Sequence, residues 1–345
     1  MDEIKEFQEA LLNWYRKSGR VLPWRSDPSP YKVWISEIML QQTRVDTVIP
    51  YFNRFISEIP TIKDLAETDD EKLYKLWQGL GYYRRASHLK KAAQIMVDQY
   101  NGRLPENFND LLTLPGIGAY TAGAILSIAF NISIPAVDGN VFRIIARINA
   151  ETGDIQKASV KKRLEACVKE LIPSTDAGDF NQALMDLGAN ICIPNGIPKC
   201  EECPVKNFCK AYSEGLAYTL PVKGNKAVRK TQEITVLKIL RDNRLALRKR
   251  EEKGLLSNLW ELPNYQSFLT EEQCIKILQN NGFKVTSIMP MERVKHAFSH
   301  MDWIMIGYLI TVEGNEDLSS WTWVTREEIL NVYSIPSAFL PFLSV

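Results

Sequence analysis

The sequence lacks the long apolar segment that a membrane span requires, because none of its apolar runs approaches about eighteen residues. We expect no secretory signal, since the first residues, MDEIKEF, form neither a basic nor an apolar region. Apolar residues make up 45% of the 345 residues and charged residues 24%, which is typical of a folded, soluble protein. We therefore expect a cytoplasmic protein that is long enough to form at least two domains.

The sequence has almost no excess of either charge, with a net charge of +1. This balance says little about partners, because binding of nucleic acids depends on where the cations lie. Two segments are locally basic: Arg84, Arg85, His88, Lys90 and Lys91 in one, and Lys223, Lys226, Arg229 and Lys230 in the other. Such runs are more often solvated faces than binding surfaces, so they favour nucleic acid only weakly.

Cysteine is scarce outside one segment. Four of the six cysteines fall within eighteen residues: Cys192, Cys200, Cys203 and Cys209. In a reducing compartment such a cluster favours a metal site over disulfide bonds. Its intervals of seven, two and five residues suit either a tetrahedral zinc or an iron–sulfur cluster, and the single C-x-x-C pair favours the cluster. Cys167 and Cys274 stand alone and are expected in the core.

Helical periodicity dominates residues 3–212, with short turn segments such as RSDPSP and NGRLPEN between amphipathic stretches. After the segment LPVKGNKAVRK, β-branched and aromatic runs of strand length take over. These runs predict strands over residues 232–240, 244–250, 302–312 and 321–325. We therefore predict a mainly α domain over residues 1–215, a linker over 216–231 and a smaller α/β domain over 232–345.

The stretch VWISEIMLQQTR, residues 33–44, places a carboxylate in an apolar helix. Residues three and four apart share a helix face, so Glu37 lies with Val33, Trp34 and Leu40 rather than with water. Burial disfavours the charged form and raises the pKa of a glutamate. Glu37 is therefore a candidate for an acid that holds a proton to donate.

The stretch LPGIGAYTAGAILSIAF, residues 114–130, predicts two helices joined by a tight turn with Gly116 and Gly118. Backbone N–H groups at the start of the second helix suit a phosphate. A Cβ at either glycine would obstruct both a positive-φ turn and the close approach of an anion. The alternative is a helical corner without a ligand, and the turn alone favours that alternative.

A second acid, Asp138, stands in IPAVDGNVFRIIARI between an apolar segment and a new helix. Aspartate is a common helix N-cap, which is the structural alternative. Two carboxylates in different environments can instead divide the roles of acid and anion, as in glycoside hydrolysis. Glu37 and Asp138 are therefore a candidate catalytic pair.

In this order, these motifs resemble the helix-hairpin-helix DNA glycosylases, in particular the adenine DNA glycosylases of the MutY type. The matching segments are PWR (23–25), SEIMLQQTRV (36–45), WQGLGYYRRA (77–86), LPGIGAYTAGA, VDGNVFRI, NQALMDLGA (181–189), the four cysteines and FSH (298–300). They extend over nearly the whole chain, and their combination is far more specific than any one of them.

The resemblance implies a helical domain of two lobes with a cleft for double-stranded DNA, a [4Fe-4S] cluster on the four cysteines, and a Nudix-like C-terminal domain. It implies base-excision repair: the enzyme would flip out adenine mispaired with 8-oxoguanine or guanine and hydrolyse its glycosidic bond. It also implies a monomer that is associated with the nucleoid if the source is bacterial.

The resemblance further implies roles for individual residues. Glu37 would protonate the adenine, and Asp138 would stabilise the oxocarbenium-like sugar, with Tyr120 and Asn140 orienting these groups. The other implied sites are the base pocket (Trp24, Arg25, Gln182), the intercalating residues (Gln42, Tyr82), the phosphate-binding hairpin (Leu114, Gly116, Ile117, Gly118) and the lesion-recognition residues (Phe298, Ser299, His300).

Position 120 separates two activities within the resemblance. The related endonuclease III family has a lysine there, which attacks the sugar as a Schiff-base nucleophile. Tyr120 cannot form an imine, so we expect a monofunctional glycosylase.

Two departures and two alternatives accompany the resemblance. The first cysteine interval is seven residues instead of the usual six. The C-terminal domain lacks the glutamate-rich helix with which Nudix hydrolases hold magnesium, so hydrolysis of free nucleotides is not expected. The alternatives are a glycosylase for pyrimidine lesions or mismatched thymine, and a DNA-binding or nucleotide-sensing protein without catalysis.

Overall fold

The computed structural model describes residues 2–224, 229–252, 254–314 and 321–343. The chain divides into two compact units. The helical unit contains Met1–Glu67 and His88–Lys226, and the mixed unit contains Thr68–Ser87 and Ala227–Val345. Residues 225–228 of the predicted linker lie outside the described residues.

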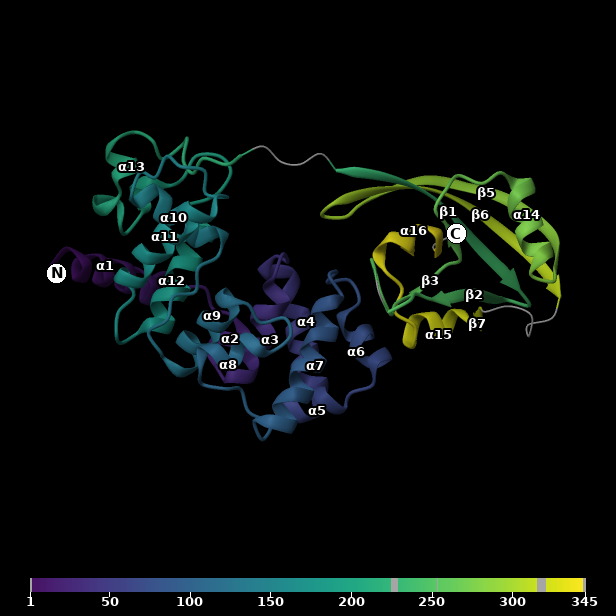
Figure 1. The fold of residues 1–345 in the computed structure, drawn as a ribbon, viewed down its shortest axis with the longest axis horizontal. Coiled ribbons are helices and arrows are strands. Elements are labelled where there is room, and N and C mark those ends of the chain that lie inside the picture. The colour runs from purple at the N-terminus through teal and green to yellow at the C-terminus, as the bar shows by residue number, and fades with distance from the viewer. Residues whose placement is uncertain (1, 225–228, 253, 315–320, 344–345) are drawn as a thin grey trace. The chain divides into compact units, whose positions relative to one another are not determined.

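The helical unit consists of short and medium helices joined by brief turns (Figure 1). Its helices are α1 (Asp2–Ser18), α2 (Pro23–Ser26), α3 (Pro30–Leu40), α4 (Val45–Glu58), α5 (Ile62–Glu67), α7 (Arg84–Gln99, whose first turn belongs to the mixed unit), α8 (Phe108–Thr113), α9 (Ala119–Phe130), α10 (Gly139–Ile148), α11 (Ala158–Leu171), α12 (Ala177–Asn190) and α13 (Lys210–Ser213). No strand occurs among its described residues, as the periodicity predicted.

Local sequence explains where the helices near the site begin. The Ser29 side chain accepts a hydrogen bond from Lys32 N, and Pro30 occupies the first turn of α3, a position where proline's missing N–H costs little. The sequence of α9 is apolar on all sides, and its residues 121–127 are buried. Since α9 packs against both α3 and α12, it forms the centre of this unit.

A close backbone approach fixes the loop that follows α9. A Cβ on Gly123 would lie 2.3 Å from Pro135 O, so only glycine allows the loop to pack against the helix there. The Asn181 side chain, from α12, accepts from Ala136 N at 3.0 Å and donates to Ile134 O at 3.0 Å. This loop leads directly to Asp138, so these contacts set the position of that residue.

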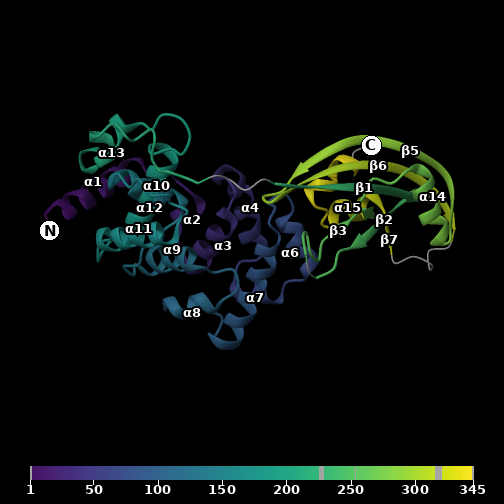
Figure 2. The same cartoon turned by 45° about the horizontal axis from the view of Figure 1, so that its top comes forward.

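The mixed unit contains a seven-stranded sheet in the order β3-β2-β1-β6-β5, with β4 paired to β1 and β7 to β2. The strands are β1 (Lys230–Arg241), β2 (Arg244–Lys249), β3 (Trp260–Glu261), β4 (Asn264–Tyr265), β5 (Phe283–Ala297), β6 (Met301–Gly314) and β7 (Thr322–Val324). Strands β1 and β6 are parallel, whereas β5 and β6 form a long antiparallel hairpin that both views show (Figures 1 and 2).

Two apolar clusters in this unit pack against the sheet. Helix α14 (Glu271–Asn280) contributes Cys274 and Leu278 to one cluster. The C-terminal segment with α16 (Leu340–Leu343) contributes Phe339 and Phe342 to the other. Helix α15 (Arg326–Asn331) follows β7. The predicted fold class, a mainly α part followed by an α/β part, is confirmed.

The mixed unit also takes up residues 68–87, which the predicted domains place in the mainly α domain. Helix α6 (Asp70–Trp77) begins with Asp69 as its N-cap. Its Glu71 carboxylate accepts from Trp260 Nε1 at 3.0 Å and from Lys249 Nζ at 2.8 Å. Lys75 Nζ donates to Ile329 O at 3.0 Å. These contacts join residues that lie far apart in the sequence.

Among the residues that the structure describes, no helix combines the length and the apolar character that crossing a bilayer requires.

Candidate active site

A cavity of about 190 Å³ lies inside the helical unit. Seven residues that the sequence singled out line it together: Trp24, Arg25, Glu37, Tyr120, Asp138, Asn140 and Gln182. They come from α2, α3, α9, α12 and the start of α10. The cavity therefore gathers side chains from helices that are distant in the sequence.

Glu37 projects from α3 and is only 4% exposed. Its Oε2 accepts a hydrogen bond of 2.8 Å from the Tyr120 hydroxyl. Burial raises the pKa of Glu37 to about 7, and the negative charge of Asp138 acts in the same direction. The hydrogen bond from Tyr120 and the positive charge of Arg25 oppose this increase in pKa. A large fraction of Glu37 is therefore protonated near neutral pH.

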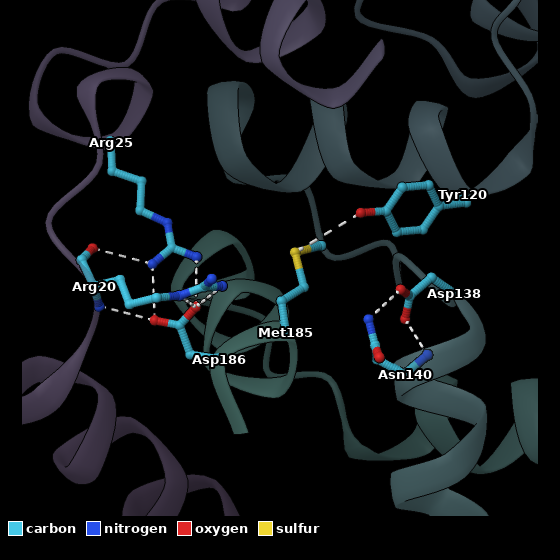
Figure 3. A network of polar contacts seen from close by, with 7 residues as sticks. All are labelled: Arg20, Arg25, Tyr120, Asp138, Asn140, Met185 and Asp186. Carbon is cyan, nitrogen blue, oxygen red and sulfur yellow. Dashed lines mark hydrogen bonds and ion pairs between the residues drawn. The ribbon is translucent and has the colours of Figure 1, made fainter. Parts of the chain in front are cut away.

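Tyr120 lies in the first turn of α9. Burial raises the pKa of this phenol well above its usual value, and the nearby Glu37 and Asp138 charges add to the increase. The hydroxyl therefore stays protonated and acts as a hydrogen-bond donor to Glu37. The Sδ atom of Met185 lies 3.8 Å from the same hydroxyl (Figure 3).

Asp138 caps α10, as the structural alternative predicted, and it also faces the cavity. One oxygen, Oδ1, accepts from the backbone N–H groups of Asn140 and Val141, both at 2.8 Å. The other, Oδ2, accepts from Asn140 Nδ2 at 2.8 Å (Figure 3). Arg143 Nη2 donates to Asn140 Oδ1 at 3.1 Å, which fixes the orientation of that amide. The first N–H groups of the helix and the Asn140 amide thus hold this carboxylate in a fixed orientation.

An ion-pair cluster that the sequence did not single out forms part of the cavity wall. Arg25 donates to both oxygens of Asp186, each at 2.9 Å, and Arg20 donates to them through its backbone N and side chain (Figure 3). Burial alone raises the pKa of Asp186, but the hydrogen bonds from both arginines outweigh it, so this pKa is lowered. Asp186 stands within NQALMDLGA, as an acid among apolar residues, which is the same signal that identified Glu37.

The remaining pocket residues are also buried. Trp24 is 5% exposed, and its ring meets Phe52 edge-on at 5.2 Å between centroids. Gln182 projects from α12 and is 9% exposed. Apolar side chains such as Trp24 and Val33 thus line the cavity together with polar ones, and convergent polar groups in a cavity are typical of a ligand site.

The two predicted intercalating residues lie in different units. Gln42 is exposed in the turn after α3 and has a φ of 60°. Tyr82 belongs to the mixed unit, is 43% exposed and has a φ of 47°. Left-handed backbone is uncommon for side chains other than glycine, asparagine and aspartate. The Arg85 guanidinium lies 5.5 Å from the Tyr82 ring and donates to Gly81 O at 3.1 Å, which holds this loop.

The predicted hairpin forms between α8 and α9. Gly116 has a φ of 82° and lies against His88, whose Cβ would be 3.0 Å from an added methyl group. Gly118 is the N-cap of α9 with a φ of −100°, so the expected positive-φ conformation at this second glycine is wrong. No atom lies within 4 Å of an added Cβ at Gly118. Leu114 and Ile117 are buried and anchor the turn.

The predicted lesion-recognition residues form the turn between β5 and β6. Phe298 N donates to Met301 O at 2.8 Å, which closes the turn. The Phe298 ring packs between His296 and Trp303, at centroid distances of 4.7 and 4.9 Å. Ser299 and His300 are exposed. The turn therefore contains one packed aromatic ring and two exposed polar side chains.

The four clustered cysteines line a second, smaller cavity in the helical unit. Arg147 Nη1 lies 3.1 Å from Cys192 Sγ, so a cation faces the sulfur atoms. A tetrahedral zinc with Zn–S bonds of about 2.3 Å would bring its sulfurs to within about 4 Å of one another. Within the described part of the chain, no three Cys, His, Asp or Glu side chains converge on one position for a metal ion. Four thiols around one cavity are ligands that either a zinc ion or an iron–sulfur cluster takes.

Comparison with protein families matches two segments of the chain. Residues 35–170 match the HhH-GPD superfamily of base excision DNA repair proteins, and residues 235–345 match the NUDIX domain. The first match contains Glu37, Tyr120 and Asp138. The two matches correspond to the helical part of the chain and to the sheet of the mixed unit.

Individual proteins resemble the chain over most of its length. The adenine DNA glycosylase of Buchnera aphidicola subsp. Baizongia pistaciae is 37% identical over 324 residues, covering 91% of this chain and 90% of that protein. The human adenine DNA glycosylase is 33% identical over 390 residues, covering 94% and 71%. A solved thermostable thymine-DNA glycosylase is 31% identical with a TM-score of 0.55, covering 62% of this chain and 98% of that one.

Proposed function

The chain belongs to the adenine DNA glycosylases, DNA N-glycosylases of base-excision repair, and we propose that it removes adenine mispaired with 8-oxoguanine or guanine. The observation that carries the proposal is the position of Glu37, a buried acid with a pKa of about 7, on the same cavity as the anchored carboxylate of Asp138. One group can donate a proton, and the other can stabilise positive charge.

The geometry supports a dissociative mechanism. A base inside a duplex is out of reach, so the adenine would be flipped into the cavity between Trp24 and Gln182. Glu37 would transfer its proton to a ring nitrogen of the adenine. The glycosidic bond would then break with its electron pair leaving on the neutral base, and the sugar would become an oxocarbenium-like cation. Asp138 would stabilise this cation until water adds to the sugar and loses a proton.

Two further residues orient the proposed acid, Glu37, and the proposed anion, Asp138. The Tyr120 hydroxyl orients the Glu37 carboxyl group, and Asn140 orients the Asp138 carboxylate. Such fixed dipoles need no reorganisation when charge develops in the transition state.

We propose that the enzyme is monofunctional. Tyr120 occupies the hairpin position of the Schiff-base lysine of the endonuclease III family, and a phenol cannot form an imine with the sugar. Borohydride trapping on a duplex with an abasic intermediate is expected to yield little covalent adduct. Abundant adduct would contradict this assignment.

We propose three groups of DNA contacts from the places of these residues in the fold. Gln42 and Tyr82 present side chains from left-handed turns, where they could wedge into the duplex around the target pair. The hairpin of Leu114, Gly116, Ile117 and Gly118 would bind a phosphate, since the space at Gly118 is open and the N-terminus of α9 attracts an anion. The turn of Phe298, Ser299 and His300 would contact 8-oxoguanine. We propose that the protein acts on double-stranded DNA as a monomer.

We propose that Cys192, Cys200, Cys203 and Cys209 hold a [4Fe-4S] cluster. When bound, the cluster would join the loop over residues 192–209 into one rigid element, which is a structural role. Iron analysis and visible absorbance of the purified protein test this assignment. Four irons per chain are expected, whereas stoichiometric zinc without iron would contradict it.

The decisive experiment offers three duplexes, with adenine opposite 8-oxoguanine, adenine opposite guanine and thymine opposite guanine, and identifies the released base. Adenine release from the first two is expected. Release only from the third duplex would favour a thymine glycosylase. Similarity to the thymine-DNA glycosylase covers 62% of the chain, whereas the adenine DNA glycosylase of Buchnera matches 91%.

A further inference from the structure

Asp186 is a fully buried carboxylate with no direct part in the proposed proton transfer. It lies on α12 and accepts hydrogen bonds from two arginines of the segment around α2. Arg25 approaches it with both terminal nitrogens, Nη1 at 2.9 Å and Nη2 at 2.9 Å, in the bidentate geometry that orients a guanidinium most firmly. Arg20 adds its backbone N at 2.9 Å and Nε at 2.8 Å (Figure 3).

The charges of this cluster do not cancel, since two guanidinium groups meet one carboxylate. Both arginines line the cavity that contains Glu37, and the Arg25 side chain is only 11% exposed, so solvent screens its charge weakly. The charge of Arg25 favours ionisation of Glu37. An ionised Glu37 has no proton to give to the adenine. The cavity thus contains a cation that opposes the proposed chemistry unless it is compensated.

We propose that Asp186 is a positioning residue of the glycosylase reaction, which holds the Arg25 guanidinium in the cavity wall and offsets its charge so that Glu37 keeps its proton. This inference rests on the proposed function, because it concerns the acid of that mechanism. It differs from a purely structural role by predicting a change in the pH dependence of the reaction.

The other charged groups that face Glu37 come from separate elements. Tyr120 approaches from α9, Asp138 from the start of α10, and Arg25 from α2. Tyr120 and Asp138 make no hydrogen bond to Asp186 among the described contacts, and their own partners are Glu37, Met185 and the first residues of α10. A substitution at Asp186 is therefore expected to reach Glu37 through Arg25.

The test is the pH profile of single-turnover adenine release for Asp186→Asn. In the wild type the rate is expected to fall as the pH rises through about 7, where Glu37 loses its proton. The amide leaves the charge of Arg25 uncompensated, so this fall is expected to move to lower pH by about 0.5–1 unit. At pH 7, where about half of the wild-type Glu37 is protonated, the rate would then decrease by about 2- to 5-fold.

A double-mutant cycle shows whether the effect passes through Arg25. In an Arg25→Gln background, Asp186→Asn is expected to move the fall by less than in the wild type, because the charge of Arg25 is already absent and only that of Arg20 loses its partner. The matched control is Glu151→Gln, which removes another arginine-paired carboxylate of the helical unit. Glu151 does not line the cavity, so its variant is expected to retain the wild-type profile.

Two results would overturn the inference. A rate loss for Asp186→Asn that is equal at every pH would assign the residue a structural role only. A wild-type profile without a fall near pH 7 would contradict the role of Glu37 as well, which distinguishes failure of the proposed function. If Asp186→Asn does not fold, Arg20→Gln replaces it. Removing that cation leaves Asp186 to Arg25 alone, and the fall is expected to move to higher pH; no movement would overturn the inference.

Discussion

The cavity of the helical unit and the turn at residues 298–300 of the mixed unit are two kinds of site. In the cavity, Glu37 and Asp186 are buried, and their oxygens accept hydrogen bonds from groups on other helices. In the turn, Ser299 and His300 are exposed, and one backbone hydrogen bond closes the loop. Several contacts thus hold the carboxylates of the first region in place, whereas the exposed side chains of the turn can adjust to a partner.

This difference matches what each region would do. Electrostatic catalysis depends on dipoles that are already in place when charge develops, so its groups must be held by packing and by second hydrogen bonds. Reading a base in a duplex needs contact with a partner that arrives from solvent, and exposed turns serve that purpose. Replacement of the acid in the cavity should therefore change the rate by orders of magnitude, whereas substitutions in the turn should mainly change selectivity.

Glu37→Gln tests the catalytic side of the comparison with the largest expected effect. The amide keeps the size of the side chain but cannot donate an acidic proton, so single-turnover adenine release is expected to fall by about 10³-fold. Binding to a duplex with adenine opposite 8-oxoguanine is expected to persist. The control is Glu165→Gln on the exposed face of α11. Undiminished release would favour a protein in which Glu37 has no catalytic role.

The same substitution should show how much the ionised, buried Glu37 lowers the free energy of unfolding at high pH. The pKa of Glu37 rises from 4.5 in its ordinary state to about 7 in the folded protein. Its neutral form contributes fully below pH 4.5, and this stability is lost as the pH rises through 7. Glu37→Gln is therefore expected to be more stable than the wild type at pH 8, by up to about 3 kcal/mol in the free energy of unfolding.

Urea unfolding of both proteins at pH 8 and pH 4.5 measures this difference. The gain should shrink at pH 4.5, where the wild-type carboxyl group is neutral in the folded state and about half neutral in the unfolded state. An equal gain at both pH values would contradict the electrostatic origin.

Sequence reasoning found the residues whose chemistry is visible locally. Glu37 was recognisable because a charge in an apolar helix is expensive, and Asp138 because it precedes a helix. Strands β1, β6 and β7 follow β-branched and aromatic runs, β2 lies in the segment RLALRKR, and the prediction of these four strands is confirmed. The long strand β5 was missed. Its sequence mixes polar and apolar residues and contains Pro290, which an edge strand tolerates but a strand pattern does not suggest.

The sequence did not predict which residues distant along the chain become interaction partners. Asp186 gives the same local signal as Glu37, but its arginines lie 166 and 161 residues away, so the cluster emerges only from the fold. The docking of Glu71 on Trp260 spans 189 residues and transfers α6 to the mixed unit. In both cases only tertiary packing brings the partners together.

His300→Ala tests the recognition side of the comparison. The side chain is exposed, so folding should be unaffected, and loss of one polar contact to the lesion is expected to slow release opposite 8-oxoguanine by about 10-fold. Release opposite guanine should stay within about 2-fold, because the lost contact is specific to the oxidised base. Gln279→Ala, an exposed position on α14, is the control. Equal losses on both duplexes would indicate a general DNA contact instead.

Tyr120→Phe has the smallest expected effect. It tests how much the Tyr120 hydroxyl contributes to the pKa of Glu37. The hydroxyl donates at 2.8 Å to Glu37, and this hydrogen bond lowers the pKa of the carboxyl group. Its removal should raise that pKa, so the fall in rate is expected to move to higher pH by about 0.5 unit. At pH 6 the rate should decrease by no more than about 5-fold, because Glu37 remains protonated and loses only an orienting contact. Tyr218→Phe, at an exposed position, is the matched control. A movement to lower pH would mean that the hydroxyl favours the neutral acid, and the cavity would then hold its proton by hydrogen bonding as well as by burial.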